Sequence, residues 1–243
     1  MNILVCMKQT EHTANKPDRS GIEAALRLKA QKEAHVKVIY IGKTSAMTLI
    51  REAIAMGCDS GALIECVPAE TLDALTLAKL LMAAVSDEVY DIIYTGCYAA
   101  DADAVQMGLL LAGLLHLPHA SYVSHVWLED RHPDSLYLKR QMEDRFQILR
   151  LSLPCLVSAL PLPGKPIYST VDGITKAYSS DINVISASKL LKRLHVEQYD
   201  ALFKIKCCRH FVKDATKRGE ILTVPADEAV EAIIEKIKSH HLL

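Results

Sequence analysis

The residues that could do chemistry gather in one loop, residues 95–108, which read TGCYAADADAVQMG. An apolar run precedes the loop and another follows it, which is typical of a strand, a tight loop and the start of a helix. A helix start offers free backbone N–H groups to an anion, yet this loop carries Asp101 and Asp103. Asp103 followed by Gln106 fits a capping box, so one interpretation is that both carboxylates only cap the helix. In the other, backbone N–H groups near residues 103–107 hold an anion while the carboxylates point elsewhere.

Small residues in the same loop would let a ligand approach the backbone closely; they are Gly96, Ala99, Ala100, Ala102 and Ala104. The usual signatures of nucleotide-binding and hydrolytic proteins do not occur, because the chain has no GxGxxG, no GxxxxGK followed by Ser or Thr, and no GxSxG. We expect no catalytic nucleophile and no metal site, since the spacing of the ten histidines suits no zinc site. The residues themselves therefore predict a module that binds an adenine nucleotide.

Composition indicates an ordinary globular protein without a nucleic-acid surface. Half of the 243 residues are apolar, the formal net charge is −1, and no long basic run occurs. The seven cysteines are odd in number and form no CxxC pair, which favours reduced thiols and a cytoplasmic location. The N-terminus does not resemble a signal peptide, and no apolar segment approaches the ~20 residues that span a bilayer. We therefore expect no membrane insertion.

Apolar runs alternate with amphipathic stretches over the first half of the chain. We expect strands at 2–8, 35–42, 61–66 and 90–96, and helices at 20–33, 45–57, 69–87 and 103–116. This alternation predicts a doubly wound α/β domain with a mostly parallel sheet. Ligands of such sheets bind beyond the carboxyl ends of the strands. The candidate positions are those just after Cys6 and Ile41, and the loop from 96 to 107.

The second half of the chain has a different pattern. Short, partly alternating runs between 120 and 160 predict antiparallel strands that extend or flank the sheet. Prolines and glycines in 161–185 predict irregular chain there, and residues 225–243 predict a helix with Pro225 before it and basic residues in its last turns. We expect an α/β domain over 1–185 and an extended C-terminal arm over 186–243 that packs on a partner.

Several stretches together resemble the beta subunit of electron transfer flavoprotein, nearly from end to end. They are ILVCMKQT, EAALRLK, IREAIAMGCD, YTGCYAADADAVQMG and LSLPCLVSALPLPGKPIYSTVDGITKA, in the family's order and spacing. The fourth resembles the family's nucleotide loop, G-x-Q-A-x-D-x-D-x-x-Q-x-G, with Tyr98 in place of the first Gln. The resemblance implies an adenine-nucleotide alpha-hydrolase-like fold and an electron carrier subunit rather than a stand-alone enzyme.

The resemblance also implies a heterodimer with an alpha subunit that binds FAD. The beta subunit holds AMP in ordinary members and a second FAD in electron-bifurcating members. Carried over to this sequence, the cofactor-binding residues would be Cys6, Asn15, Ile41, Gly96, Cys97, Tyr98, Ala99, Ala100, Asp101, Ala102, Asp103, Ala104, Val105, Gln106 and Met107. Asn15 corresponds to the family's Asn-Pro helix entry, which Lys16 interrupts before Pro17. Residues 169–177 lie where the family has its recognition loop for dehydrogenases.

Two features of the resemblance point in opposite directions. Residues 9–20 are shorter than the family's stretch that encloses the nucleotide, which argues against a second FAD. The opening VCMKQT and the ending EAVEAIIEKIKSHHLL resemble the anaerobic, bifurcating branch. Our first hypothesis is a subunit that relays electrons from a dehydrogenase to another carrier. The alternative is a redox-inactive adenine-nucleotide sensor or scaffold.

Overall fold

The computed structural model describes residues 1–8, 16–66, 72–97, 104–161, 165–196, 202 and 222–239, with the backbone alone for 16–18 and 104–105. The chain divides into two compact units, Met1–Ile205 and Lys206–Leu243. The first unit carries the sheet and all of the candidate site. The second contains a single described helix.

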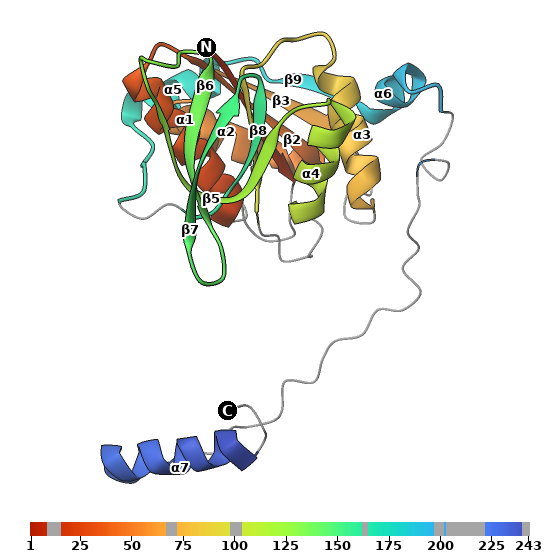
Figure 1. Ribbon diagram of the computed structural model, residues 1–243. Coiled ribbons are helices and arrows are strands. Elements are labelled where there is room, and N and C mark those ends of the chain that lie inside the picture. The colour runs from red at the N-terminus through yellow and green to blue at the C-terminus, as the bar shows by residue number, and fades with distance from the viewer. Residues whose placement is uncertain are drawn as a thin grey trace. The chain divides into compact units, whose positions relative to one another are not determined.

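A sheet of nine described strands organises the first unit, in the order β7-β6-β5-β8-β4-β1-β2-β3-β9 (Figure 1). The strands are β1 (Asn2–Lys8), β2 (His35–Gly42), β3 (Ser60–Glu65), β4 (Ile92–Gly96), β5 (His119–Leu128), β6 (Ser135–Gln141), β7 (Phe146–Ser152), β8 (Cys155–Ala159) and β9 (Asn183–Ser186). All neighbouring pairs from β5 through β9 along this order are parallel. Only β5–β6 and β6–β7 are antiparallel.

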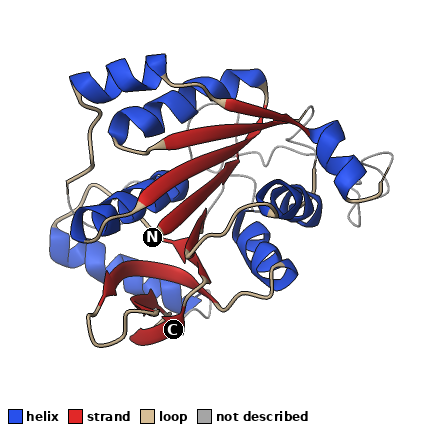
Figure 2. Ribbon diagram, turned by 90° about the horizontal axis from the view of Figure 1, so that it is seen from above, coloured by secondary structure: helices blue, strands red, loops and turns tan. Residues whose placement is uncertain are grey.

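Helices cover both faces of this sheet (Figure 2). They are α1 (Lys16–Gln31), the short 3-10 helix η1 (Thr44–Ala46), α2 (Met47–Met56), α3 (Ala74–Val85), α4 (Ala104–Leu114), α5 (Val171–Ser179) and α6 (Ala187–Arg193). Buried side chains of α1, α2 and α5 form one core with the sheet, and those of α3, α4 and α6 form the other. The expected doubly wound α/β fold is confirmed.

The inner strands form where the sequence is continuously apolar. Ile3 through Met7 of β1 are completely buried, because helices cover the strand from both sides. The expected strands at 2–8 and 35–42 match β1 and β2. Helix α2 ends at Gly57, which has a φ of 130°. Glycine adopts this backbone conformation without strain, whereas other residues do not. The Gly57 N–H donates a hydrogen bond to the carbonyl of Ala53, which closes the helix end.

The expectation that every strand after residue 120 is antiparallel is wrong for β8. This strand runs parallel to both β4 and β5 and lies between them. All five of its residues are buried, as is usual for an inner strand with helices on both faces. The antiparallel region of the sheet therefore begins only where β6 pairs with β5.

The expectation of irregular chain over 161–185 is also wrong. Residues 171–179 form α5, which begins at Thr170, whose hydroxyl caps the N–H of Gly173. Residues 183–186 form β9 and extend the sheet beside β3. Helix α6 follows at once and buries Leu190 and Leu191 against the core that α3 shares. The first unit consequently runs to Ile205 and not to residue 185.

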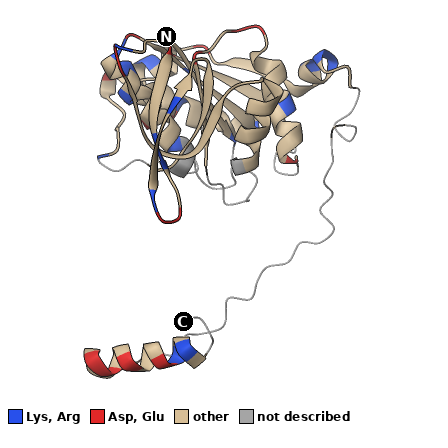
Figure 3. Ribbon diagram, in the orientation of Figure 1, with Lys and Arg blue, Asp and Glu red and all other residues tan. Residues whose placement is uncertain are grey.

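The second unit contains α7 (Ala226–Ser239), which confirms the helix expected near the C-terminus. Asp227 and Glu228 occupy its first turn and Lys236 and Lys238 its last, the arrangement that a helix dipole favours (Figure 3). No side chain of α7 is buried. Within the described ranges, no helix is long and apolar enough to cross a membrane.

Candidate functional site

The order of the strands creates a switch point between β1 and β4. Helix α1 follows β1 onto one face of the sheet, and α4 follows β4 onto the opposite face. The two connections leave in opposite directions, and ligands of doubly wound sheets bind beyond the carboxyl ends of the strands at such a point. The loop that stood out in the sequence begins at this point.

Cys6 and Ile41 lie close to that edge, but their side chains are buried. Cys6 pairs with Ile39 and Thr95 inside the sheet, and Ile41 pairs with Lys8. Both side chains are 0% exposed and belong to the core beneath α3 and α4. They therefore position the strand ends, and only the chain that follows them reaches the edge.

Gly96 and Cys97 stand at the edge itself. Gly96 is the last residue of β4 and pairs with Ala159 of β8. Cys97 is buried, which raises the pKa of its thiol, and a hydrogen bond from the Tyr122 N–H partly offsets this rise. Of the other residues expected at the site, Asn15, Tyr98, Ala99, Ala100, Asp101, Ala102 and Asp103 lie outside the described residues. The capping box at Asp103 lies outside them as well.

The remaining candidates form the first turn of α4. The helix starts at Ala104 and Val105, Gln106 is exposed, and Met107 is buried in the core. The N–H groups of a first helical turn have no partner within the helix. Together with the helix dipole, such a turn favours a nearby anion by about 0.3–1 kcal/mol.

Gly108 holds this turn against the sheet. A Cβ atom at Gly108 would lie 2.3 Å from Thr95 Oγ1 and 2.9 Å from Ser158 Oγ. These two hydroxyls are buried and share a hydrogen bond of 2.9 Å across β4 and β8. The backbone of α4 therefore rests directly on the two strand ends, which fixes its N-terminal turn at the switch point.

Two features of the edge were not among the residues selected from the sequence. Lys8 ends β1 with only 4% of its surface exposed. Tyr122 has a φ of 60° at an irregularity in β5. The signal for Lys8 was its place at the end of an apolar run. No signal in the sequence marks the backbone conformation of Tyr122.

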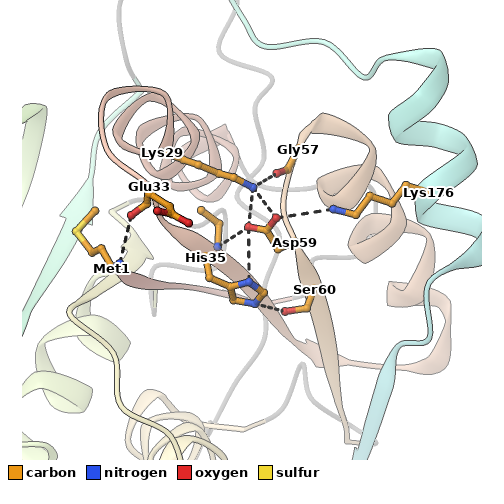
Figure 4. Close-up of polar contacts among 9 residues, drawn as sticks. Met1, Lys29, Glu33, His35, Gly57, Asp59, Ser60 and Lys176 are labelled. Carbon is orange, nitrogen blue, oxygen red and sulfur yellow. Dashed lines mark hydrogen bonds and ion pairs between the residues drawn. The ribbon is translucent and has the colours of Figure 1, made fainter.

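A second polar cluster surrounds Asp59, which directly precedes β3 and so lies at the amino ends of the parallel strands. Figure 4 shows its contacts. Lys29 Nζ lies 2.6 Å from both carboxylate oxygens, and the Val36 N–H donates to one of them at 2.8 Å. Lys176 of α5 and His35 approach to 3.8 Å. Burial raises the pKa of Asp59, but the Lys29 and Val36 hydrogen bonds and the nearby cations outweigh it and leave the pKa lowered. This cluster ties α1 and α5 to the sheet.

The chemistry that the switch point supports is binding. Within the described ranges, no three His, Cys, Asp or Glu side chains are placed to hold a metal ion. The switch point instead offers the backbone N–H groups of the first turn of α4 and the small residue Gly96 at the end of β4. A doubly wound α/β unit with the start of a helix at its switch point has the architecture that many nucleotide-binding domains share.

Comparison with known proteins narrows that class to one family. The model of the electron transfer flavoprotein domain matches residues 3–190. The electron transfer flavoprotein subunit beta of Thermoanaerobacterium thermosaccharolyticum is 29% identical over the whole of both chains. The human subunit beta is 34% identical over 74% of this chain and 71% of its own. The acryloyl-CoA reductase electron transfer subunit gamma of Anaerotignum propionicum is 27% identical over the whole of both chains. The chain therefore belongs to the electron transfer flavoprotein family, whose function is electron transfer.

Proposed function

We propose that this chain is the beta subunit of a heterodimeric electron transfer flavoprotein. With an FAD-binding alpha subunit, it would relay electrons from a dehydrogenase to another carrier in the cytoplasm. The observation that carries the proposal is similarity over the full length of both chains to a protein named as such a subunit. A flavin supplies the electron chemistry when bound, and the protein supplies binding, orientation and electrostatics.

The nucleotide of this subunit, AMP or FAD, would lie at the switch point. The first turn of α4 would hold its phosphate through backbone N–H groups, and Gly96 would let the ligand approach the end of β4. The small residues of 98–103 belong to the same proposed site.

Helix α5 is the proposed docking surface for the redox partner, because it contains most of residues 169–177, the segment expected to recognise dehydrogenases. Two large side chains of α5 are mostly exposed, Val171 at 81% and Tyr178 at 74%, as is Tyr168 just before the helix, at 74%. The helix itself is firmly seated. Arg51 of α2 donates to the carbonyl of Ala177 and lies over the ring of Tyr178. A helix held by these contacts, with exposed aromatic and aliphatic side chains, is suited to binding a protein partner.

The second unit is the proposed arm that packs on the alpha subunit. Within the second unit, α7 presents large apolar side chains that are exposed: Val230 at 55%, Ile233 at 50% and Ile234 at 40%. Such a helix gains stability when its apolar stripe is buried on a partner.

Identifying the nucleotides in the purified complex tests this proposal. The chain would be co-expressed with the product of the neighbouring gene, and the nucleotides released by denaturation would be identified by chromatography. One FAD with one AMP per heterodimer, or two FAD, is the expected result. A stable complex that contains no flavin would refute the proposal and leave a redox-inactive scaffold as the better description.

A further inference from the structure

A groove of about 270 Å³ lies between α2 and α5, beside the proposed docking surface. Thr48, Arg51 and Glu52 line it from α2, and Ile174 and Tyr178 line it from α5. The two α5 side chains are also among the exposed large apolar groups of that helix, at 46% and 74%. A partner protein seated on α5 would therefore cover the groove as well.

Arg51 uses one of its terminal nitrogen atoms to hold α5. Its Nη1 atom donates to the carbonyl of Ala177 and lies 3.5 Å from the carbonyl oxygen of Ser180, at the C-terminal end of α5. Its guanidinium carbon lies 5.3 Å from the centre of the Tyr178 ring. Among the described residues, no acceptor bonds to the Nε or Nη2 atom of Arg51. The edge of the guanidinium group that carries Nε and Nη2 is therefore open to a ligand.

The charges around the groove favour an anion. Arg51 forms no ion pair with a described residue, whereas Glu52, the carboxylate in the same wall, is already bound by Arg19 of α1 at 2.7 Å. The Nε and Nη2 atoms of an arginine match the two oxygens of a carboxylate, which gives two parallel charge-assisted hydrogen bonds. Arginine is also enriched among the residues that carry most of the binding energy of protein interfaces.

The size of the groove suits one side chain of a partner. Sites for cofactors and other small molecules usually have volumes of about 300–1,000 Å³, and this groove is smaller. Ile174 and the ring of Tyr178 offer apolar surface to the methylene groups of an aspartate or glutamate side chain. The groove thus combines a site for a carboxylate with a short apolar wall.

We propose that this groove binds a carboxylate side chain, from an aspartate or a glutamate, of the redox partner that docks on α5. Arg51 would donate two hydrogen bonds to that carboxylate through Nε and Nη2, while Nη1 continues to hold α5. The inference rests on the proposed function, because it takes α5 as the docking surface for a dehydrogenase. It adds that an acidic residue of the dehydrogenase is recognised at this surface.

Reduction of the purified heterodimer by the acyl-CoA dehydrogenases of the source organism, each purified separately, tests this inference. The variant Thr48→Glu places a carboxylate one turn before Arg51, where it can pair with the open edge and block the groove. For the dehydrogenase that reduces the wild-type heterodimer best, the KM for the heterodimer should rise about tenfold or more, the usual scale for losing hydrogen bonds between charged groups. The kcat should change by less than about twofold, because the groove only binds.

Two variants separate the charge from other effects of the substitution. Thr48→Gln adds the same bulk without the charge, so it should raise the KM much less than Thr48→Glu does. Ser45→Glu adds the same charge at an exposed position that does not line the groove, so it should leave the KM within about twofold. Raising the salt concentration from about 50 mM to about 500 mM should raise the KM of the wild type severalfold and that of Thr48→Glu far less. Circular dichroism and nucleotide content would check that each variant is folded and loaded.

The outcomes distinguish the groove from the docking surface. Val171→Ser removes a side chain of α5 that is 81% exposed and lies outside the groove. A raised KM for Val171→Ser with an unchanged KM for Thr48→Glu would overturn the groove and leave α5 as the docking surface. An unchanged KM for both variants would refute the docking surface too. If succinate inhibited the wild type but not Thr48→Glu, with equal KM values, the groove would take a free carboxylate instead. Failure of every dehydrogenase to reduce the wild-type heterodimer would refute the proposed function itself.

Discussion

Replacing Gly108 by alanine should displace the first turn of α4 and destabilise the first unit. The new methyl group would sit 2.3 Å from Thr95 Oγ1, far inside van der Waals contact, and 2.9 Å from Ser158 Oγ. Overpacking of this kind costs about 1–3 kcal/mol, and disturbing the buried Thr95–Ser158 hydrogen bond costs about 0.5–1.5 kcal/mol. The higher helix propensity of alanine returns about 1 kcal/mol. We expect a net loss of about 1–3 kcal/mol in the free energy of unfolding, with weaker nucleotide retention.

Gly113 offers a matched control in the same helix. A Cβ atom there meets nothing within 4 Å, so Gly113→Ala should stabilise the chain by up to about 1 kcal/mol through propensity alone. Urea unfolding of both variants, with the nucleotide content of each preparation, provides the comparison. In the Thr95→Ala background, Gly108→Ala should cost at least about 1 kcal/mol less, because the nearest clash is gone. If Gly108→Ala were as stable as Gly113→Ala, the close contact between α4 and the strand ends would not exist.

Three further outcomes are expected. Because the pKa of Asp59 is lower in the folded chain, the unfolded chain binds more protons in acid, and the free energy of unfolding should fall as the pH drops below about 4. The variant Asp59→Asn should flatten this part of the pH profile. An unchanged slope would show that folding does not stabilise the Asp59 carboxylate. Burial raises the pKa of Cys58 and of Cys155 to about 12. After treatment of the native protein with iodoacetamide at pH 8, mass spectrometry should therefore find neither thiol alkylated. In denatured protein both should be alkylated. Deleting residues 206–243 should abolish the heterodimer on size exclusion yet leave a cooperatively unfolding first unit; a retained complex would refute the role of the arm.

The parallel region of the fold was predictable because burial on both faces leaves a local trace. Strands such as 2–8 and 35–42 are continuous apolar runs, and Gly57 marks the end of α2. The position of β8 has no such trace. Its apolar run would look the same beside any neighbour, and only the completed sheet inserts it between β4 and β5.

Helix α5 was missed because Gly173 and nearby turn residues lower the local helix propensity. The structure places Gly173 where α5 crosses α2, since a Cβ atom there would lie 2.2 Å from the carbonyl oxygen of Ala55. Gly173 is therefore needed for the close packing of α2 and α5, and the same glycine is why the sequence did not predict α5. Tertiary contact outweighs local propensity at this position.

The strand ends that border the candidate site were predictable from the sequence, but the other features of that edge were not. The carboxyl-edge rule located Gly96 and the start of α4 from the pattern of strands and helices alone. Tyr122 was not selected, because its φ of 60° at the irregularity in β5 has no signal in the sequence.

The last strand of the sheet has a consequence for synthesis of the chain. Strand β9 covers the outer edge of β3 by pairing Ala62 with Asn183, two residues made far apart in time on the ribosome. Until β9 emerges, β3 presents an open row of N–H and C=O groups to other chains. The nascent protein therefore passes through a stage in which most of its sheet can form but one edge remains able to aggregate. A premature stop before residue 183 would leave the chain permanently at that stage.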